Sequence, residues 1–213
     1  MTTGTGSDEE VAVALRALGA ATLGESGGAA AHRRLRPAWV GAGLAAPAFP
    51  VRCTPGDNLA VHVAVTKAPA GSALVVDVGQ VADRGYWGEV LTTAAEAAGI
   101  AGLVIDGGVR DVGALEAHGF PVFSATIALP GATKDKPGAV GAPVRVGGVE
   151  VAAGDWVVAD VDGVTFVPRD SLEEVLAAGR AREAKEAGFF EALRAGQTTV
   201  ELLGLDASLI SEG

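Results

Sequence analysis

The sequence predicts an α/β fold with a mixed parallel and antiparallel core, arranged as a β/β/α sandwich in one domain. Two observations predict it. Between residues 73 and 124, three apolar strands alternate with two helical segments, which is typical of a parallel sheet with helical crossovers. From residue 144 onward, short β-branched segments are separated by glycine-containing turns, which is typical of antiparallel hairpins. A length of 213 residues without a long linker favours a single domain over residues 1–213.

The first part of the chain, about residues 1–48, is expected to be a helical segment. Ser7 to Glu10 has the form of a capping box, and apolar residues recur at helical spacing directly after it. Residues 20–28 are expected to form a loop, and residues 38–48 are rich in Ala, Gly and Pro with little periodicity. A short strand is expected at residues 49–53.

The central region alternates between helices and strands. The turn from Pro55 to Asn58 precedes a helix over residues 59–66, for which Asp57 is the expected cap. From residue 73 to residue 124, the spacing of apolar residues and the positions of glycines predict where each strand and helix begins and ends. The expected elements are a strand at 73–78, a loop at 79–86, a helix at 87–98, a strand at 101–106, a turn at 107–110, a helix at 111–118 and a strand at 121–124.

Hairpins and one long helix are expected in the last part of the chain. The expected strands lie at 144–146, 149–151, 155–159 and 164–167. Hairpin turns are expected between successive strands, at Gly147-Gly148, Ala153-Gly154 and Asp162-Gly163. Ser171 to Glu174 opens a C-terminal helix over about residues 171–195.

Composition and charge exclude several classes of function. The chain has 16 Lys and Arg against 26 Asp and Glu, a net charge of −10, which disfavours binding to nucleic acid or to an anionic membrane. No apolar run is long enough to span a bilayer, and no secretory signal is visible at the N-terminus. The single Cys53 excludes an internal disulfide. We therefore expect a cytoplasmic protein with no nucleic-acid or membrane partner.

The window from residue 86 to 111 carries the candidate chemistry. In open parallel sheets, ligands bind where the carboxyl ends of the strands meet the following helix starts. Free backbone N–H groups at such a helix start bind carboxylates and phosphates. The residues expected to supply them are Gly88, Glu89, Val90 and Leu91. Arg110 offers a clamp for a carboxylate or carbonyl oxygen, and Glu89 and Asp111 offer oxygen ligands for a hard cation such as Mg²⁺.

Each of these residues also has a purely structural interpretation. A glutamate such as Glu89 is favoured near a helix start by the helix dipole, and Asp111 is in position to cap a short helix. Arg110 beside Asp111 in a turn is typical of a solvated surface pair. His62, on an apolar segment, is expected to be a core or interface residue, and Cys53 is expected to be inert.

The spacing Gly88-Glu89, twenty residues, Arg110-Asp111, within GEVLTTAAEAAGIAGLVIDGGVRD, resembles a known family. That family contains the class II 4-hydroxy-4-methyl-2-oxoglutarate/4-carboxy-4-hydroxy-2-oxoadipate aldolases and the regulator of ribonuclease activity A. TPGDNLAVHVAV resembles its upstream segment, and GDWVVADVDGVTFVP resembles its downstream hairpins. The resemblance covers most of the chain and is weak before Asn58 and after about Ala195.

The resemblance implies a swivelling-domain-like β/β/α sandwich that forms trimers, often stacked into hexamers, with active sites between subunits. It implies Mg²⁺ or Mn²⁺ as cofactor and a small 2-oxo acid as substrate, with oxaloacetate decarboxylation as a further activity. Proteins of this family sometimes carry a menaquinone methyltransferase label, but the chain has no glycine-rich nucleotide loop after any expected strand.

The family pattern also assigns roles to individual residues. Backbone N–H groups of residues 88–91 would hold the pyruvyl carboxylate, Arg110 would contact the keto oxygen, Asp111 would bind the metal and Glu89 would hold a metal water. The aldolases commonly have Asp where this chain has Glu89. A further acidic ligand is implied from the neighbouring subunit's C-terminal helix, with Glu186 the best spaced candidate and Glu183 the next.

The resemblance, with which the chemistry of these residues agrees, implies a metal-dependent lyase that forms the enolate of pyruvate, by aldol cleavage of a 4-hydroxy-2-oxo acid or by decarboxylation of oxaloacetate. A cation and a guanidinium stabilise the developing oxyanion without a covalent bond. A Schiff-base route needs a lysine in an apolar pocket, whereas the four lysines fall in an element end, a polar loop and a charged helix. Two alternatives stay open: a non-catalytic regulator that binds and inhibits an RNA-degradation endonuclease, and an enzyme for a different oxo acid.

Overall fold

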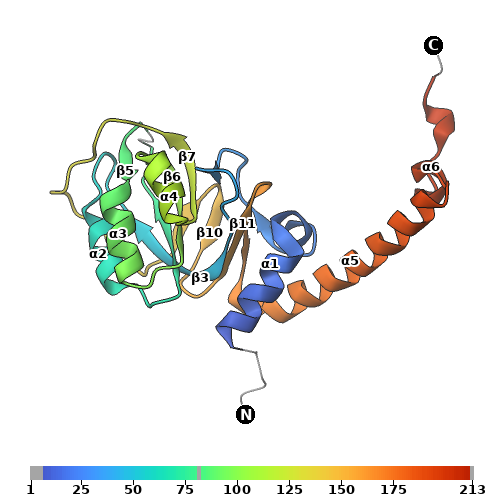
Figure 1. The fold of residues 1–213 in the computed structure, drawn as a ribbon, viewed down its shortest axis with the longest axis horizontal. Coiled ribbons are helices and arrows are strands. Elements are labelled where there is room, and N and C mark those ends of the chain that lie inside the picture. The colour runs from blue at the N-terminus through green and yellow to red at the C-terminus, as the bar shows by residue number, and fades with distance from the viewer. Residues whose placement is uncertain (1–6, 81–82, 212–213) are drawn as a thin grey trace.

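One long curled sheet organises the chain. The computed structural model describes residues 7–80 and 83–211, and within them the sheet runs in the order β1-β12-β11-β3-β4-β6-β7-β2, with β5 on β6 and β8 on β3 (Figure 1). Its strands are β1 (Ala29–Ala30), β2 (Arg36–Pro37), β3 (Leu44–Arg52), β4 (Ala73–Asp77), β5 (Gly85–Trp87), β6 (Gly102–Val109), β7 (Val122–Ile127), β8 (Ala139–Val140), β11 (Trp156–Asp160) and β12 (Gly163–Val167). A separate hairpin pairs β9 (Val144–Val146) with β10 (Val149–Val151).

The helices are α1 (Asp8–Gly24), α2 (Leu59–Lys67), α3 (Glu89–Ala97), α4 (Val112–His118), α5 (Leu172–Arg194) and α6 (Thr199–Leu203). Two short 3-10 turns lie at Arg169–Ser171 and Ala207–Leu209. No helix in residues 7–80 and 83–211 is both long enough and apolar enough to cross a membrane.

Strand β3 joins the parallel and antiparallel parts of the sheet. Its first half pairs antiparallel with β11, whereas residues 48–52 pair parallel with β4. Beyond β4 the sheet continues in parallel through β6 and β7. The mixed α/β fold predicted from the sequence is therefore confirmed.

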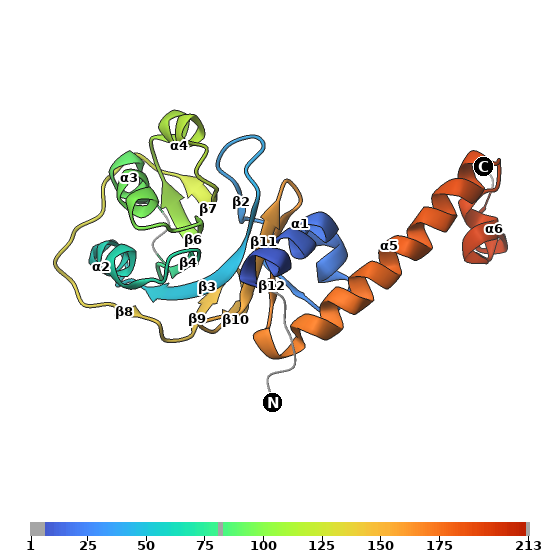
Figure 2. The same cartoon turned by 60° about the horizontal axis from the view of Figure 1, so that its bottom comes forward.

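The parallel strands form the middle of three layers. Alternate residues of β4 and β6 face opposite sides, as the two-residue period of a strand requires. Leu74 and Ile105 pack in the apolar cluster that includes residues of α2, α3 and α4, whereas Val75 and Val104 pack in the cluster that includes the β9–β10 hairpin and β11–β12. Figure 2 shows the three helices on one side of the strands and the hairpin on the other. This is the predicted β/β/α order.

The N-terminal prediction is corrected by the structure. Residues 1–6 of the expected helical segment 1–48 lie outside the described residues. In its described part, only α1 is helical, and the rest contains β1, β2 and the first half of β3. The capping box is present, with the Ser7 hydroxyl accepting from the Glu10 N–H. The helix bends at Gly19, whose φ is 77°, and then runs on to Gly24, because Asp160 Oδ2 accepts the Ala20 N–H at 2.8 Å. Residues 20–28 are thus partly helix rather than loop.

Three further elements differ from the sequence prediction. Strand β6 continues through the glycines expected to form a turn and ends at Val109. Strand β5 takes up the last two residues of the expected loop 79–86 and the first residue, Trp87, of the expected helix 87–98. Residues 81–82 of that loop lie outside the described residues. The turn at Ala153-Gly154 does not close a hairpin, because β10 pairs with β9 and β11 pairs with β12 and β3.

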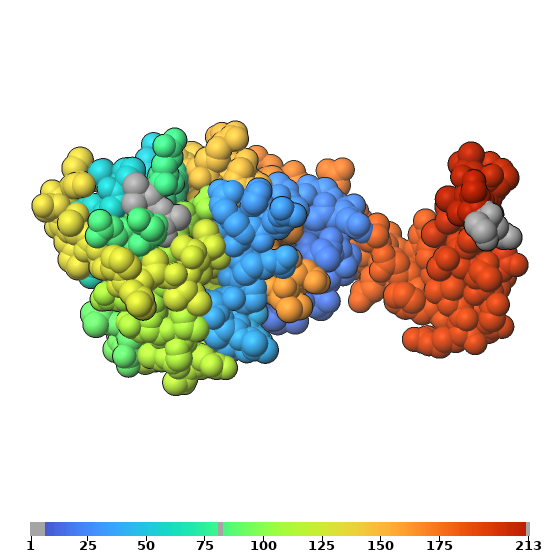
Figure 3. All heavy atoms as spheres, turned by 90° about the horizontal axis from the view of Figure 1, so that it is seen from above, coloured from blue at the N-terminus to red at the C-terminus, as the bar shows by residue number. Residues whose placement is uncertain are grey.

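The C-terminal helix leaves the body of the molecule. Helix α5 occupies Leu172–Arg194, close to the expected range, and only Leu172, Val175 and Gly179 are buried. In Figure 3 the orange and red C-terminal part stands clear of the rest. Figures 1 and 2 place α5 on the opposite side of the molecule from α3.

Candidate functional site

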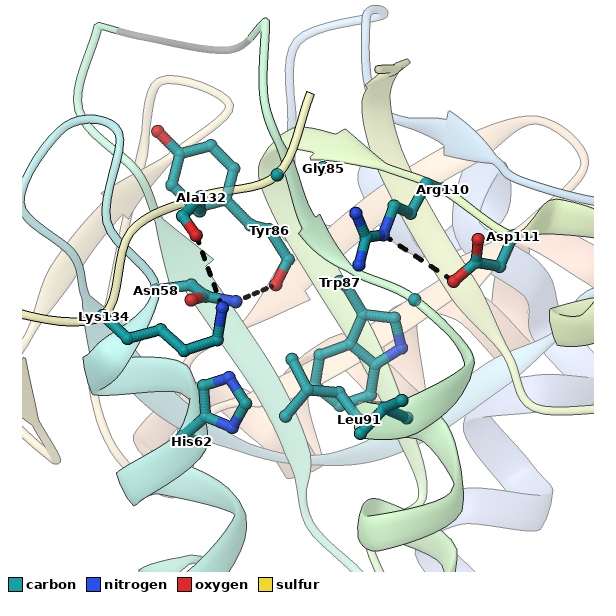
Figure 4. Close-up of a pocket in the computed structure, with 13 residues that line it drawn as sticks. Asn58, His62, Gly85, Tyr86, Trp87, Leu91, Arg110, Asp111, Ala132 and Lys134 are labelled. Atoms are coloured by element: carbon teal, nitrogen blue, oxygen red, sulfur yellow. Dashed lines mark hydrogen bonds and ion pairs between the residues drawn. The ribbon is translucent and has the colours of Figure 1, made fainter. Parts of the chain in front are cut away.

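A small pocket lies where β5 and β6 end and α3 and α4 begin. Its cavity volume is about 170 Å³, smaller than the roughly 300–1,000 Å³ of drug-sized sites, so it fits a small molecule. It is the position expected for a ligand of a parallel sheet. The lining residues are Asn58, His62, Gly85, Tyr86, Trp87, Gly88, Val90, Leu91, Arg110, Asp111, Gly131, Ala132 and Lys134 (Figure 4).

Asp111 is held in a strained conformation that turns its side chain toward α3. Its φ of 58° is the only positive value for a non-glycine residue in the described part of the chain. Strain of this kind persists where the surroundings enforce it, often at functional sites. Asp111 occupies the N-cap position of α4 without capping it, and its Oδ2 instead accepts the Glu89 N–H at 3.1 Å. The capping interpretation of Asp111 is therefore wrong.

Gly88 makes room for this carboxylate. A Cβ on Gly88 would lie 2.4 Å from Asp111 Oδ2 and 3.1 Å from Arg110 Cγ. The backbone of Gly88 is extended, so glycine is needed for the close approach and not for its conformation. The N–H groups of Val90 and Leu91 follow in the first turn of α3, where the helix offers them no carbonyl acceptor. They give the pocket an anion-binding edge.

Arg110 lies across the pocket mouth. Its N–H donates to the Trp87 carbonyl at 2.9 Å, which fixes the end of β6 against β5. Its Nε is 3.7 Å from Asp111 Oδ2, and the side chain is about half exposed. A Cβ on Gly85 would lie 3.1 Å from Arg110 Cδ, and one on Gly131 would lie 3.5 Å from Nη1. Two glycines thus leave the guanidinium a path into the pocket.

The Glu89 side chain lies away from this cluster. Its carboxylate Oε1 is 3.8 Å from His118 Nε2, and His118 Nδ1 is in turn 2.9 Å from Glu96 Oε2. Glu89 is not among the residues that line the pocket. Its backbone N–H affects the pocket only indirectly, by donating a hydrogen bond to Asp111 Oδ2. The structure therefore brings together Gly88, Val90, Leu91, Arg110 and Asp111, but not the Glu89 carboxylate.

Glu186 and Glu183 are also remote within one chain. Both lie on α5, and Glu186 Oε1 pairs with Arg182 Nε at 2.9 Å. Arg182 pairs with Glu25 as well, which ties α5 to the end of α1. Any contact of these carboxylates with a pocket requires a second copy of the chain.

Three pocket residues were not predicted as functional. Asn58 is 5% exposed and its Nδ2 donates to the Tyr86 carbonyl at 2.8 Å, yet its Oδ1 has no hydrogen-bond partner among the described residues. His62 Nε2 is likewise buried without a partner in the described part of the chain. Lys134, expected in a polar loop, is exposed at the rim. The available signal was the spacing of Asn58 and His62, which at i and i+4 share one helix face.

Burial, with the Lys134 ammonium as the second cause, lowers the pKa of His62, while the Asp57 carboxylate opposes the shift. The burial of Cys53 raises the pKa of its thiol to about 12, in agreement with the expectation that it is inert.

Asp57 fixes the loop that closes the pocket. Burial alone would raise its pKa, but hydrogen bonds hold it well below the usual range of an aspartate. Oδ1 accepts the Leu59 N–H at 2.9 Å, so Asp57 caps α2 as expected. Oδ2 accepts from Thr133 Oγ1 and the Asp135 N–H at 2.7 Å each and from the Lys136 N–H at 3.2 Å. One buried carboxylate thereby ties the loop after β7 to the start of α2.

The donor set fits a hydrated hard cation. In residues 7–80 and 83–211, no group of three or more His, Cys, Asp and Glu side chains is placed to hold a metal ion. Mg²⁺ is commonly bound through one or two carboxylates and otherwise by water and substrate oxygens. Asp111 supplies one such carboxylate next to the Arg110 guanidinium.

Comparison with known proteins identifies the family. Residues 8–166 match the family described as RraA-like, Aldolase/RraA. The chain belongs to this family. The match extends farther toward the N-terminus than the resemblance seen in the sequence, because α1 and β1–β3 are part of the common fold.

Several curated relatives are named as aldolases. The chain is 36% identical over 140 residues to a protein of Halalkalibacterium halodurans named "Putative 4-hydroxy-4-methyl-2-oxoglutarate aldolase", covering 66% of this chain and 67% of that one. For two further relatives, Protein DlpA of Legionella pneumophila and a putative 4-hydroxy-4-methyl-2-oxoglutarate aldolase of Albidiferax ferrireducens, the aligned part spans 24% and 76% of the relative's own length.

Solved structures confirm the fold. A structure of an uncharacterized protein from Pseudomonas syringae pv. tomato matches with a TM-score of 0.79 at 28% identity, covering 92% of this chain and 97% of that one. The structure of the RNA-processing inhibitor RraA from Thermus thermophilis matches with a TM-score of 0.64 at 28% identity, covering 70% and 92%.

Proposed function

We propose that this family member is a divalent-metal-dependent lyase that forms the enolate of pyruvate. Its reactions would be retro-aldol cleavage of a 4-hydroxy-2-oxo acid of the 4-hydroxy-4-methyl-2-oxoglutarate type, decarboxylation of oxaloacetate, or both. The observation that carries the proposal is the strained Asp111 beside Arg110, facing the N–H groups of the first turn of α3 in one small pocket. The aldolase name of a relative at 36% identity supports it.

Each group has a defined task. The N–H groups of Val90 and Leu91 bind the substrate carboxylate, and the Arg110 guanidinium stabilises the oxygen that becomes negative in the enolate. Asp111 would hold Mg²⁺ or Mn²⁺, which would supply Lewis-acid stabilisation of the negative charge that develops in the enolate. Glu89 contributes its N–H, which holds Asp111 in place.

The proposal is tested by pyruvate release from oxaloacetate with Mg²⁺ and with excess EDTA, after subtraction of the spontaneous metal-catalysed reaction. We expect turnover that EDTA abolishes and that Asp111→Ala and Arg110→Ala each reduce by about 10²-fold or more. Arg145→Ala and Glu150→Ala, exposed on the β9–β10 hairpin, serve as controls. Intact turnover in either pocket variant would refute the assignment.

Lys134 at the pocket rim makes a covalent route testable in the same assay. A Schiff-base lysine works when desolvation lowers its pKa, and Lys134 is exposed. Borohydride added with substrate should leave activity intact. Irreversible inactivation would favour the lysine route over the metal route.

We further propose that the active form is a homotrimer or hexamer in which α5 of a neighbouring subunit supplies Glu186, or Glu183, to the pocket. The arm formed by α5 and α6 stands clear of its own chain and exposes large apolar side chains, which mark interaction surfaces (Figure 3). These side chains are Phe190, Val200, Leu203, Leu205, Leu209 and Ile210. We expect a trimer or hexamer by light scattering, and a loss of Mg²⁺ affinity in Glu186→Gln without loss of assembly.

The regulator of an RNA-degradation endonuclease remains a second candidate function. It is favoured by the structural match to the RNA-processing inhibitor RraA. A purified oligomer with no turnover above the blank, but with inhibition of a ribonuclease, would support this function instead of the enzyme.

A further inference from the structure

The wall of the pocket opposite Arg110 is polar, and two buried atoms on it have no hydrogen-bond partner in the described part of the chain. Figure 4 shows Asn58, His62 and Lys134 on one side, Arg110 and Asp111 on the other, and Trp87 and Leu91 between them. Asn58 Oδ1 and His62 Nε2 are buried, line this pocket and have no hydrogen-bond partner within residues 7–80 and 83–211. Buried polar atoms are almost always paired with protein or with ordered water. Two such atoms without a protein partner on one pocket wall therefore mark a place where a ligand group can pair with both in place of water.

The chemistry of the two atoms defines that group. The Asn58 amide is oriented by its Nδ2, which donates to the Tyr86 carbonyl at 2.8 Å, so Oδ1 is left as an acceptor only. In the tautomer protonated on Nε2, the His62 imidazole offers a donor on the same wall. A hydroxyl group both donates and accepts, whereas a carboxylate or a keto oxygen only accepts. A hydroxyl is therefore the group that satisfies both atoms.

We propose that Asn58 and His62 form a hydroxyl-binding subsite that selects 4-hydroxy-2-oxo acids. The substrate hydroxyl donates to Asn58 Oδ1 and accepts from His62 Nε2, while the 2-oxo acid end lies at Arg110 and the start of α3. This inference rests on the proposed function, because it names which substrates that pocket prefers. Oxaloacetate has no 4-hydroxyl in its keto form and leaves the subsite unused.

The two reactions make the subsite measurable. In His62→Ala, we expect kcat/KM for cleavage of 4-hydroxy-4-methyl-2-oxoglutarate to fall about 10–100-fold, with a fall of less than about threefold for oxaloacetate decarboxylation. His62→Gln places an amide N–H near the lost Nε2–H, and it should recover much of the cleavage rate. Asn58→Ala should show the same selective loss. His32→Ala, at an exposed histidine remote from the pocket, is the matched control.

A binding measurement separates this inference from the proposed function. Calorimetric titration with 2-hydroxy-2-methylsuccinate and its deoxy analogue 2-methylsuccinate needs no turnover. We expect the wild type to prefer the hydroxy acid and His62→Ala to lose that preference. An enzyme without either activity that still shows this preference would refute the proposed function and leave the subsite intact. Equal loss of both activities, no loss of either, or an unchanged preference in His62→Ala would overturn the subsite.

Discussion

Replacing Gly88 with alanine tests whether the position of Asp111 controls activity. The new Cβ would lie 2.4 Å from Asp111 Oδ2, whereas real Cβ contacts almost never fall below 3.0 Å. The carboxylate or the turn must therefore move by at least about 0.6 Å. Catalytic groups have to be held within about 0.5 Å of their productive geometry, and a misplacement of about 1 Å can cost about 10²-fold in rate. We expect kcat in Gly88→Ala to fall by about 10²-fold.

The fold should tolerate this change. The extended backbone of Gly88 accepts any residue, so only the contact with Asp111 and Arg110 is strained, and overpacking costs typically about 1–3 kcal/mol. Gly113→Ala is the matched control, because a Cβ there meets no atom within 4 Å and Gly113 lies inside helix α4. That control should keep full activity and have a slightly higher melting temperature, since alanine is favoured over glycine in helices.

The assay combines pyruvate release with thermal unfolding followed by circular dichroism. In an Asp111→Ala background the additional destabilisation by Gly88→Ala should shrink, because the clashing carboxylate is gone. Wild-type activity in Gly88→Ala, or a drop matched by Gly113→Ala, would show that the placement of Asp111 does not limit the reaction.

The remaining predictions concern Asp57, whose buried carboxylate ties the loop after β7 to the start of α2. Asp57→Ala removes a charged acceptor of four hydrogen bonds from a position that is 1% exposed. We expect the free energy of unfolding, measured in urea, to fall by about 3 kcal/mol or more, because the loss of a buried charged acceptor leaves its donors unpaired. Because hydrogen bonds lower the folded-state pKa of Asp57, its stabilisation is complete above the ordinary aspartate range near pH 4 and is lost as pH falls toward the folded value. The melting temperature should thus drop on acidification below about pH 4, and less steeply in Asp57→Asn. A pH profile unchanged by Asp57→Asn would contradict this assignment.

Local sequence signals predicted much of the scaffold. The apolar runs that became β4 and the first part of β6, the amphipathic α3 and the capping box at Ser7 all act through neighbours close in sequence. Strand β3 was underestimated because residues 44–48 are mostly alanine and have weak intrinsic strand preference. Pairing with β11 on one side and β4 on the other makes them a strand.

Close packing decided the end of β6. Two glycines indicated a turn, yet Gly107 is in a strand whose neighbour Val78 leaves no space, since a Cβ there would lie 2.7 Å from Val78 Cγ2. The glycine is a packing requirement between two elements distant in sequence. Because Gly107 fits beside Val78, strand β6 continues to Val109, and Arg110 and Asp111 directly after it line the pocket.

By itself, the sequence determined the α/β class, the parallel crossovers and the candidate window of residues 88–111, because hydrophobic period and the geometry of parallel strands place that window at one edge of the sheet. Only the tertiary structure decided which side chains meet there. It turned the Glu89 carboxylate to His118, placed Asp111 against Gly88, and brought Asn58 and His62 to the opposite wall. These contacts join residues 23 to 53 positions apart in the sequence. Their direction depends on backbone angles and packing that no local pattern specifies.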